Sequence, residues 1–99
     1  MQFILIAFDK AGGQPLRMAN RPAHLAYCEK ELGSRLLYGG PMLAEDGHLK
    51  GSVLIIEAAD EAEAEALFAA DPYALAGLFE YTTLSGFKTV FRDGILVQV

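Results

Sequence analysis

Residues 49–71, LKGSVLIIEAADEAEAEALFAAD, predict a strand followed at once by a helix. The arm Leu49–Glu57 is too short for a helix, and its central β-branched run suits a buried strand. Asp60 is a candidate helix cap, and Glu63, three residues later, completes a capping box. The predicted helix has a mostly apolar stripe made of Ala62, Ala66, Leu67 and Ala70.

A strand, a helix and a second strand are expected before this stretch. Residues Met1–Asp9 are rich in Ile, Phe and Leu, which predicts a strand. A helix is expected from the candidate cap Asn20, with Pro22 in its first turn, to Gly33. The next strand should begin at Arg35; the residues that break it or reverse the chain are Gly39, Gly40, Pro41, Asp46 and Gly47.

The remaining elements complete a recognisable order. A short helical turn is expected from Tyr73 to Leu78, and a long strand from Phe79 to Phe91 with a bulge at Gly86. The order strand, helix, strand, strand, helix, strand predicts an α+β, ferredoxin-like two-layer sandwich with both helices on one face of an antiparallel sheet. We expect residues 1–99 to form one domain, in which residues 94–99 add a strand-like tail.

The strands have apolar residues on both faces. In the first strand Phe3, Leu5 and Ala7 share one face, and the residues between them, which share the other, are also apolar. Two helices can cover only one side of the sheet, so we predict a homodimer that packs sheet against sheet. The alternative is that the tail folds back over the second face or exchanges between subunits.

Composition and charge argue against several classes of function. The net charge of −5 and a pI near 4.8 disfavour binding to nucleic acid. The apolar stretch Phe3–Phe8 is too short for a membrane span and lacks the flanks of a signal peptide. A single cysteine, Cys28, fits a reducing compartment such as the cytoplasm. We expect no cofactor and no metal site, with His48 solvated beside Asp46.

The candidate catalytic residues are His24 and Asp71. His24 lies on a helical stripe with Arg21 and Cys28, at the rim of the core, where an imidazole can act as a general acid or base. The alternative for His24 is a surface or packed histidine. The alternative for Asp71 is a cap of the helix that Pro72 begins. Contact between the two side chains is left open. In the simple topology the first helix starts at one end of the sheet and the second helix ends at the other.

Three further residues are candidates for substrate binding. Arg21 could hold an anionic group, although a solvated arginine is an equal alternative. Ser52, at a strand entry, is expected to bind a ligand rather than to attack it. Tyr73, like Tyr27 and Tyr38, could line a pocket for a small molecule or simply sit at the edge of the core.

Several segments resemble the YCII-related protein family over Met1–Phe91. These segments are Arg21–Leu25 (RPAHL), Gly40–Pro41, Gly51–Ser52, Asp71–Tyr73 (DPY) and Ala76–Glu80 (AGLFE). The resemblance implies a ferredoxin-like fold, a dimeric α/β barrel and an active site whose histidine and aspartate match His24 and Asp71. The tail Ile95–Val99 departs from the family pattern and could alter the dimer or cover a pocket mouth.

The resemblance also suggests a type of reaction. The family includes a dehydrochlorinase of a chlorinated hydroxyquinol, and muconolactone isomerases share the broader fold. The implied chemistry is proton transfer on a small ring, by a lyase-like or isomerase-like enzyme. The alternative is a metabolite-binding or accessory dimeric module without catalysis.

Overall fold

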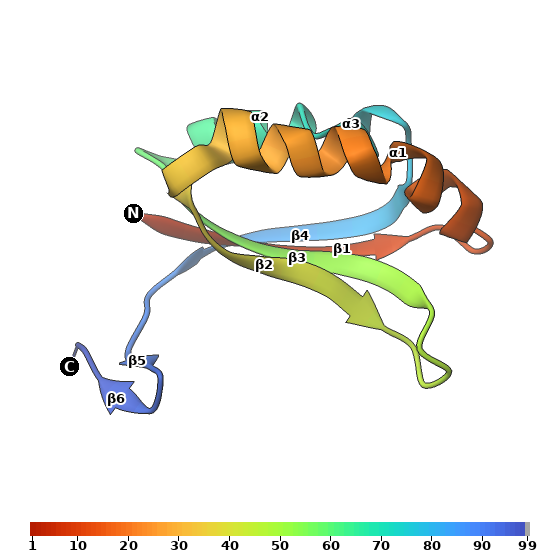
Figure 1. Cartoon of the computed structure of the whole chain (residues 1–99). Helices are drawn as coiled ribbons and strands as arrows, with labels where there is room; N and C mark the ends of the chain where they lie inside the picture. The colour runs from red at the N-terminus through yellow and green to blue at the C-terminus, as the bar shows by residue number, and fades with distance from the viewer. Residues whose placement is uncertain (99) are drawn as a thin grey trace.

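The computed structural model describes residues 1–98 and contains one four-stranded antiparallel sheet with helices on one face (Figure 1). The strand order is β2-β3-β1-β4, and both central strands pair antiparallel with their neighbours. The elements are β1 (Gln2–Asp9), α1 (Gln14–Tyr27), β2 (Leu36–Leu43), β3 (Leu49–Glu57), α2 (Glu61–Ala69), α3 (Pro72–Leu75), β4 (Phe79–Phe87), β5 (Phe91–Arg92) and β6 (Ile95–Leu96). This topology confirms the predicted ferredoxin-like fold.

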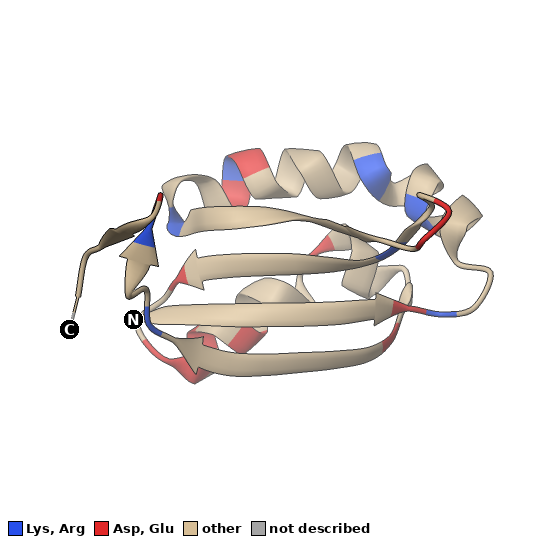
Figure 2. Ribbon diagram, turned by 90° about the horizontal axis from the view of Figure 1, so that it is seen from below, with Lys and Arg blue, Asp and Glu red and all other residues tan. Residues whose placement is uncertain are grey.

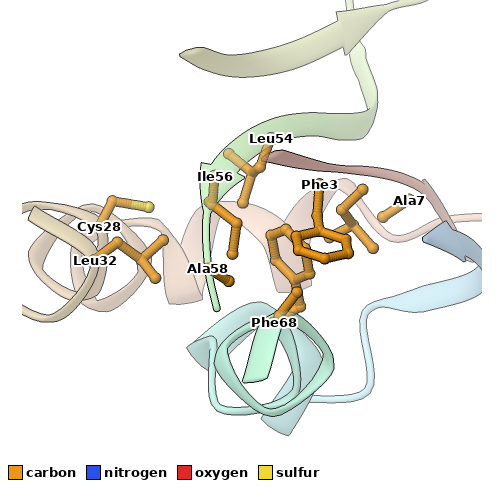
Figure 3. Packing of buried hydrophobic residues seen from close by; sticks show 10 residues of the cluster. Phe3, Ala7, Cys28, Leu32, Leu54, Ile56, Ala58 and Phe68 are labelled. Carbon is orange, nitrogen blue, oxygen red and sulfur yellow. The ribbon is translucent and has the colours of Figure 1, made fainter. Parts of the chain in front are cut away.

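The core lies between the sheet and the helices. Phe3, Leu5 and Ala7 of β1 are buried on the helix side, as their alternation predicts. They pack with buried side chains of β3 and with Phe68 of α2, and Figure 3 shows Phe68 pointing toward Phe3. The buried residues of α2 are Ala64 and Phe68. Of the predicted stripe only Leu67 packs against the core, partly buried, whereas its three alanines are exposed. The predicted capping box at Asp60 is present.

Helix α1 begins at Gln14, six residues before the predicted cap Asn20. Pro15 falls in its first turn, where the missing N–H removes no helical hydrogen bond. Asn20 does not cap; its side-chain amide donates to the carbonyl of Leu16. Pro22 is tolerated inside the helix. The chain continues from α1 into a π-helical turn, Cys28–Leu32, and a short 3-10 turn, Gly33–Arg35.

Other element boundaries also differ from prediction. Strand β2 runs without a break through Gly39, Gly40 and Pro41, because β2 is an edge strand and tolerates a missing N–H. Gly86 pairs regularly with Phe3, and the irregularity of this ladder lies between Phe8 and Asp9 instead. Helix α3 ends at Leu75 and β4 at Phe87, both earlier than expected.

The tail forms a small hairpin of its own. Strands β5 and β6 pair around Asp93 and Gly94, which both have positive φ, as a two-residue hairpin turn requires. Figure 1 shows the hairpin leaving the end of β4 toward the face of the sheet that carries no helix. The predicted strand Ile95–Val99 therefore exists over Ile95–Leu96, and Val99 lies outside the described residues.

The second face of the sheet, here called the open face, has no helix over it (Figure 1). Ile4, Ile6, Val53 and Ile55 lie there and are only half-buried in the single chain. In Figure 2 this face carries its charged residues at or near the ends of the strands. No helix within residues 1–98 is long and apolar enough to span a membrane.

Candidate active site

His24 and Asp71 are in direct contact. The Nδ1 atom of His24 lies 2.8 and 2.9 Å from the two carboxylate oxygens of Asp71, and both residues are buried. The early start of α1 places His24 in the last turns of a long helix, and the turn after α2 directs Asp71 back toward it. This geometry resolves the open question about their contact.

Asp71 also caps helix α3, as the alternative interpretation of this residue predicted. Its Oδ1 accepts a hydrogen bond of 2.9 Å from the backbone N–H of Tyr73. An ionised carboxylate only accepts hydrogen bonds, so Nδ1 of His24 is the donor in the hydrogen bond to Asp71. In the neutral imidazole this leaves the lone pair on Nε2, the nitrogen that a base needs free.

Tyr73 holds the plane of the histidine ring. Its ring is stacked on His24 with centroids 4.0 Å apart and 12° between the planes, and Phe79 meets it edge-on at 6.2 Å. Burial raises the pKa of the Tyr73 hydroxyl, and the positive charge of Arg17 offsets part of that rise. Tyr73 therefore stays a neutral phenol at neutral pH.

A buried arginine that sequence reasoning missed completes the site. Arg17 is 2% exposed; its Nε and Nη2 donate to the two carboxylate oxygens of Asp9 at 2.7 and 2.9 Å. Nη2 also donates to Ser52 Oγ at 2.8 Å, and the guanidinium lies 4.6 Å from the Tyr73 ring centroid. Burial lowers the pKa of Arg17, but the hydrogen bond and charge of Asp9 together with smaller contributions from Tyr73 outweigh burial, and the net shift of this pKa is upward.

The spacing of α1 contains the signal that would have revealed Arg17. Arg17 precedes Arg21 by four residues and His24 by seven, and these intervals place all three on one face of a helix. The predicted helix start at Asn20 excluded Arg17 from that face. Asp9 carries no comparable signal, because it ends a strand and meets Arg17 only in the folded chain.

These side chains surround a cavity of about 130 Å³ between α1 and the β2–β3 edge of the sheet. The candidates Arg21, His24, Ser52 and Tyr73 line this cavity, and Asp71 lies behind His24. Gly39 forms part of the wall, since a Cβ there would come within 2.6 Å of a Leu54 methyl group. The side chains and backbone that complete the lining are Arg17, Leu25, Cys28, Leu36, Gly40, Pro41, Leu49 and Leu54.

Other predicted candidates lie elsewhere. Tyr27 donates to the carbonyl of Leu67, and Tyr38 is exposed, so neither lines the cavity. His48 pairs with Asp46 in the β2–β3 turn, and the part of the chain from 1 to 98 holds no cluster of three potential metal ligands.

Cys28 lies beside the histidine, with Sγ 3.7 Å from Nε2. Burial, aided by the charge of Asp71, raises the pKa of this thiol to about 11. At neutral pH the group is therefore a protonated thiol and a poor nucleophile.

We expect alkylation of Cys28 by iodoacetamide to rise about tenfold per pH unit from pH 7 to 10 without levelling, because only the thiolate reacts. In the urea-unfolded protein, the matched control, the rate should level off near pH 9, since an ordinary thiol titrates at about 8.5. Mass spectrometry measures both rates. A native profile that levels off near pH 8 to 9 would contradict a raised pKa.

The topology and the buried histidine–carboxylate pair define the class: a ferredoxin-like α+β protein with a candidate acid–base site. The chain belongs to the YCII-related domain family, whose profile matches residues 1–88. It is 38% identical to protein YciI of Escherichia coli O6:H1 over 98 residues, which cover 92% of this chain and 100% of that protein.

Solved structures agree with this assignment. The 5-chloro-2-hydroxyhydroquinone dehydrochlorinase of Burkholderia phenoliruptrix AC1100, in complex with 2,5-dihydroxybenzoquinone, is similar with a TM-score of 0.81 and 35% identity. The match covers 89% of this chain and 94% of that one. A dimeric ferredoxin-like protein of unknown function from Jannaschia sp. CCS1 shares the fold alone, with a TM-score of 0.50, 14% identity and coverage of 89% and 98%.

Proposed function

We propose that this protein is a small-molecule enzyme in which His24 transfers a proton and Asp71 orients it. The observation that carries the proposal is the hydrogen bond from Nδ1 to Asp71, which leaves the lone pair on Nε2, beside the weakly donating thiol of Cys28 at 3.7 Å, on a side chain that lines a cavity. A carboxylate in this position fixes the tautomer and stabilises the imidazolium that forms.

The reaction class is elimination or isomerisation. Nε2 of His24 accepts a proton from the substrate, and the released electron pair moves into the ring system. In an elimination the pair expels a leaving group, and the proton leaves with it as HX. In an isomerisation the imidazolium returns the proton to another atom of the substrate. Neither route needs an oxidant or a reductant.

The size of the cavity supports a single small ring as substrate. Engineered apolar cavities of about 150 Å³ bind benzene, and the volume here is about 130 Å³. The dehydrochlorinase similar to this chain is named for a chlorinated hydroxylated ring and holds a dihydroxylated quinone. We therefore propose small hydroxylated rings as the substrate class.

The test is to incubate the wild-type protein with 5-chloro-2-hydroxyhydroquinone and measure chloride release. A parallel incubation with small cyclic enones in D₂O, followed by proton NMR, detects isomerisation through deuterium uptake. Enzymatic chloride release or deuterium uptake above the rate without protein supports the proposal. Ligands that raise the Tm without any turnover would instead identify a binding module.

We also propose that the protein works as a homodimer whose open faces pack together. The apolar residues of this face would otherwise remain in contact with water. The tail supports the same arrangement, because Phe91 and Ile95 are 65% and 66% exposed in a hairpin that projects toward that side. The acidic net charge argues against nucleic acid as an alternative partner.

We propose a reducing compartment such as the cytoplasm as the location of the protein, because its single cysteine is a free thiol.

Ile6→Glu should convert the dimer to a monomer at about 10 µM, because an unpaired charge buried in an apolar interface costs several kcal/mol, or more than about 100-fold in affinity. Equilibrium sedimentation measures the change. The control is Leu75→Glu, which adds the same charge at an exposed leucine of α3, away from the open face. A wild-type protein that sediments as a monomer at this concentration would refute the dimer.

A further inference from the structure

The hydrogen bonds of Arg17 occupy only part of its guanidinium. Of five N–H groups, three are used: Nε and one N–H of Nη2 on Asp9, and the other N–H of Nη2 on Ser52. The two N–H groups of Nη1 make no hydrogen bond of ordinary geometry within residues 1–98, and the other close neighbour of the guanidinium is Tyr73, whose hydroxyl helps to raise the pKa of Arg17. A buried arginine whose third nitrogen is left unused is unusual, because unpaired buried donors are costly.

The Nη1 atom is not sealed inside the protein. Over residues 1–98 the one fully buried side-chain nitrogen or oxygen that lacks a partner is Gln14 Oε1. Nη1 therefore keeps some accessible surface, although Arg17 as a whole is only 2% exposed. Arg17 lines the cavity beside His24, and we therefore assign that surface to the cavity.

The charges that line this cavity are all positive. Arg17 and Arg21 are its charged lining residues, together with the titratable His24. The carboxylates of Asp9 and Asp71 hold Arg17 and His24 from behind and do not line the cavity. Arg21 forms no ion pair with the part of the chain that the structure describes. A positive pocket in a chain with a net charge of −5 is suited to an anion.

We infer that Arg17 binds an ionised oxygen of a small ring ligand through Nη1, so that the substrate is a phenolate or enolate rather than a neutral ring. This inference rests on the proposed function and names the substrate class of the same site. When His24 removes a proton, negative charge grows on the ring oxygen, and Arg17 stabilises it. Asp9 and Ser52 are positioning residues that fix the plane of the guanidinium.

The geometry explains why an arginine is needed. One edge of the guanidinium, Nε and Nη2, forms the bidentate pair with Asp9, and Nη1 is the nitrogen left for a ligand in the cavity that Arg17 lines. A lysine ammonium has no such fork and cannot hold Asp9 in two places while presenting a fixed donor to a ligand. Arg17→Lys should therefore lose affinity for the anion even though the charge is kept.

The experiment is isothermal titration calorimetry at pH 7 with 2,5-dihydroxybenzoquinone, an acidic ring that is anionic there, and with hydroquinone, a neutral ring of similar size. The variant is the double substitution Asp9→Leu with Arg17→Met, which removes both charges together and so leaves no buried charge unpaired. We expect it to bind the anionic ring about 10- to 100-fold more weakly, as loss of hydrogen bonds from a charged donor predicts. Arg17→Lys is measured beside it.

Two controls make the outcome readable. Arg92→Met removes an exposed arginine of β5 and should leave both affinities unchanged. Hydroquinone affinity should change less than about threefold in every variant, because a neutral ring offers Arg17 no charge to neutralise. The inference is overturned if the double variant binds the anionic ring as tightly as wild type. It is overturned equally if wild type binds that ring no better than hydroquinone, or not at all.

The failure of this inference is distinguishable from failure of the proposed function. Binding is measured without turnover, so the preference for the anionic ring can hold in a protein that catalyses nothing. His24→Asn keeps Arg17 and should retain that preference while losing any turnover. Turnover without anion preference would refute the role of Arg17 and leave that of His24 in place.

Discussion

His24→Asn is expected to lower kcat/KM for the proposed reaction by about 100- to 10,000-fold, which is the range that general acid–base catalysis contributes. Asparagine is smaller than histidine, but its amide N–H₂ can take the place of Nδ1 as the donor to Asp71, and it cannot carry a proton between atoms at neutral pH. The rate of chloride release or deuterium uptake measures the loss. A variant that keeps the wild-type rate would exclude His24 as the proton-transfer group.

Asp71→Asn tests the orienting role with little loss of structure. An asparagine still caps α3 through its oxygen, but it offers His24 no negative charge, and the preferred tautomer is no longer enforced. The rate should fall by a factor that approaches the His24→Asn effect. The matched control is Asp60→Asn, the same change at the cap of α2, where no histidine is present. Equal effects at both positions would show that only capping matters.

Asp9→Asn is expected to lower the free energy of unfolding by about 3–5 kcal/mol, because it leaves the charge of Arg17 buried without its partner. The side chains of Arg17 and Asp9 are 2% and 5% exposed, so solvent cannot replace the lost carboxylate. Urea denaturation followed by circular dichroism measures the change. For a chain of this size, such a loss is a large part of the total stability.

Two variants separate charge from packing in this prediction. Asp46→Asn removes the carboxylate of an exposed pair with His48 and should leave the free energy of unfolding almost unchanged, because solvent screens this pair. The double substitution Asp9→Leu with Arg17→Met should recover most of the stability that Asp9→Asn loses, because it removes both charges. If the double variant is as unstable as Asp9→Asn, the cost comes from lost packing and the electrostatic explanation is wrong.

The parts of the fold that follow from local pattern could be predicted from the sequence. The alternation of Phe3, Leu5 and Ala7 gave the buried face of β1, and the capping box at Asp60 gave the start of α2. The start of α1 could not be found in this way. Asn20 and Pro22 resemble a helix beginning, while the actual start at Gln14 has no side-chain cap.

The site could be predicted only in part, for a similar reason. His24 and Asp71 are candidates from their positions in the sequence, but their pairing rests on a family resemblance, since 47 residues separate them and no local pattern brings them together. The Arg17–Asp9–Ser52 group joins a helix, the end of one strand and the entry of another. Such contacts depend on tertiary packing, which no local spacing in the sequence records.

Asp71 links the folding of α3 to the chemistry of the site through one carboxylate, both of whose oxygens contact His24. Oδ1 accepts both from the first turn of α3 and from the imidazole, so any fluctuation that unwinds this turn also frees the ring to rotate. The turn carries Tyr73, the residue stacked on that ring, and would take it away at the same time. The arrangement of Asp71, Tyr73 and the imidazole should therefore form and be lost together with helix α3, as one cooperative unit.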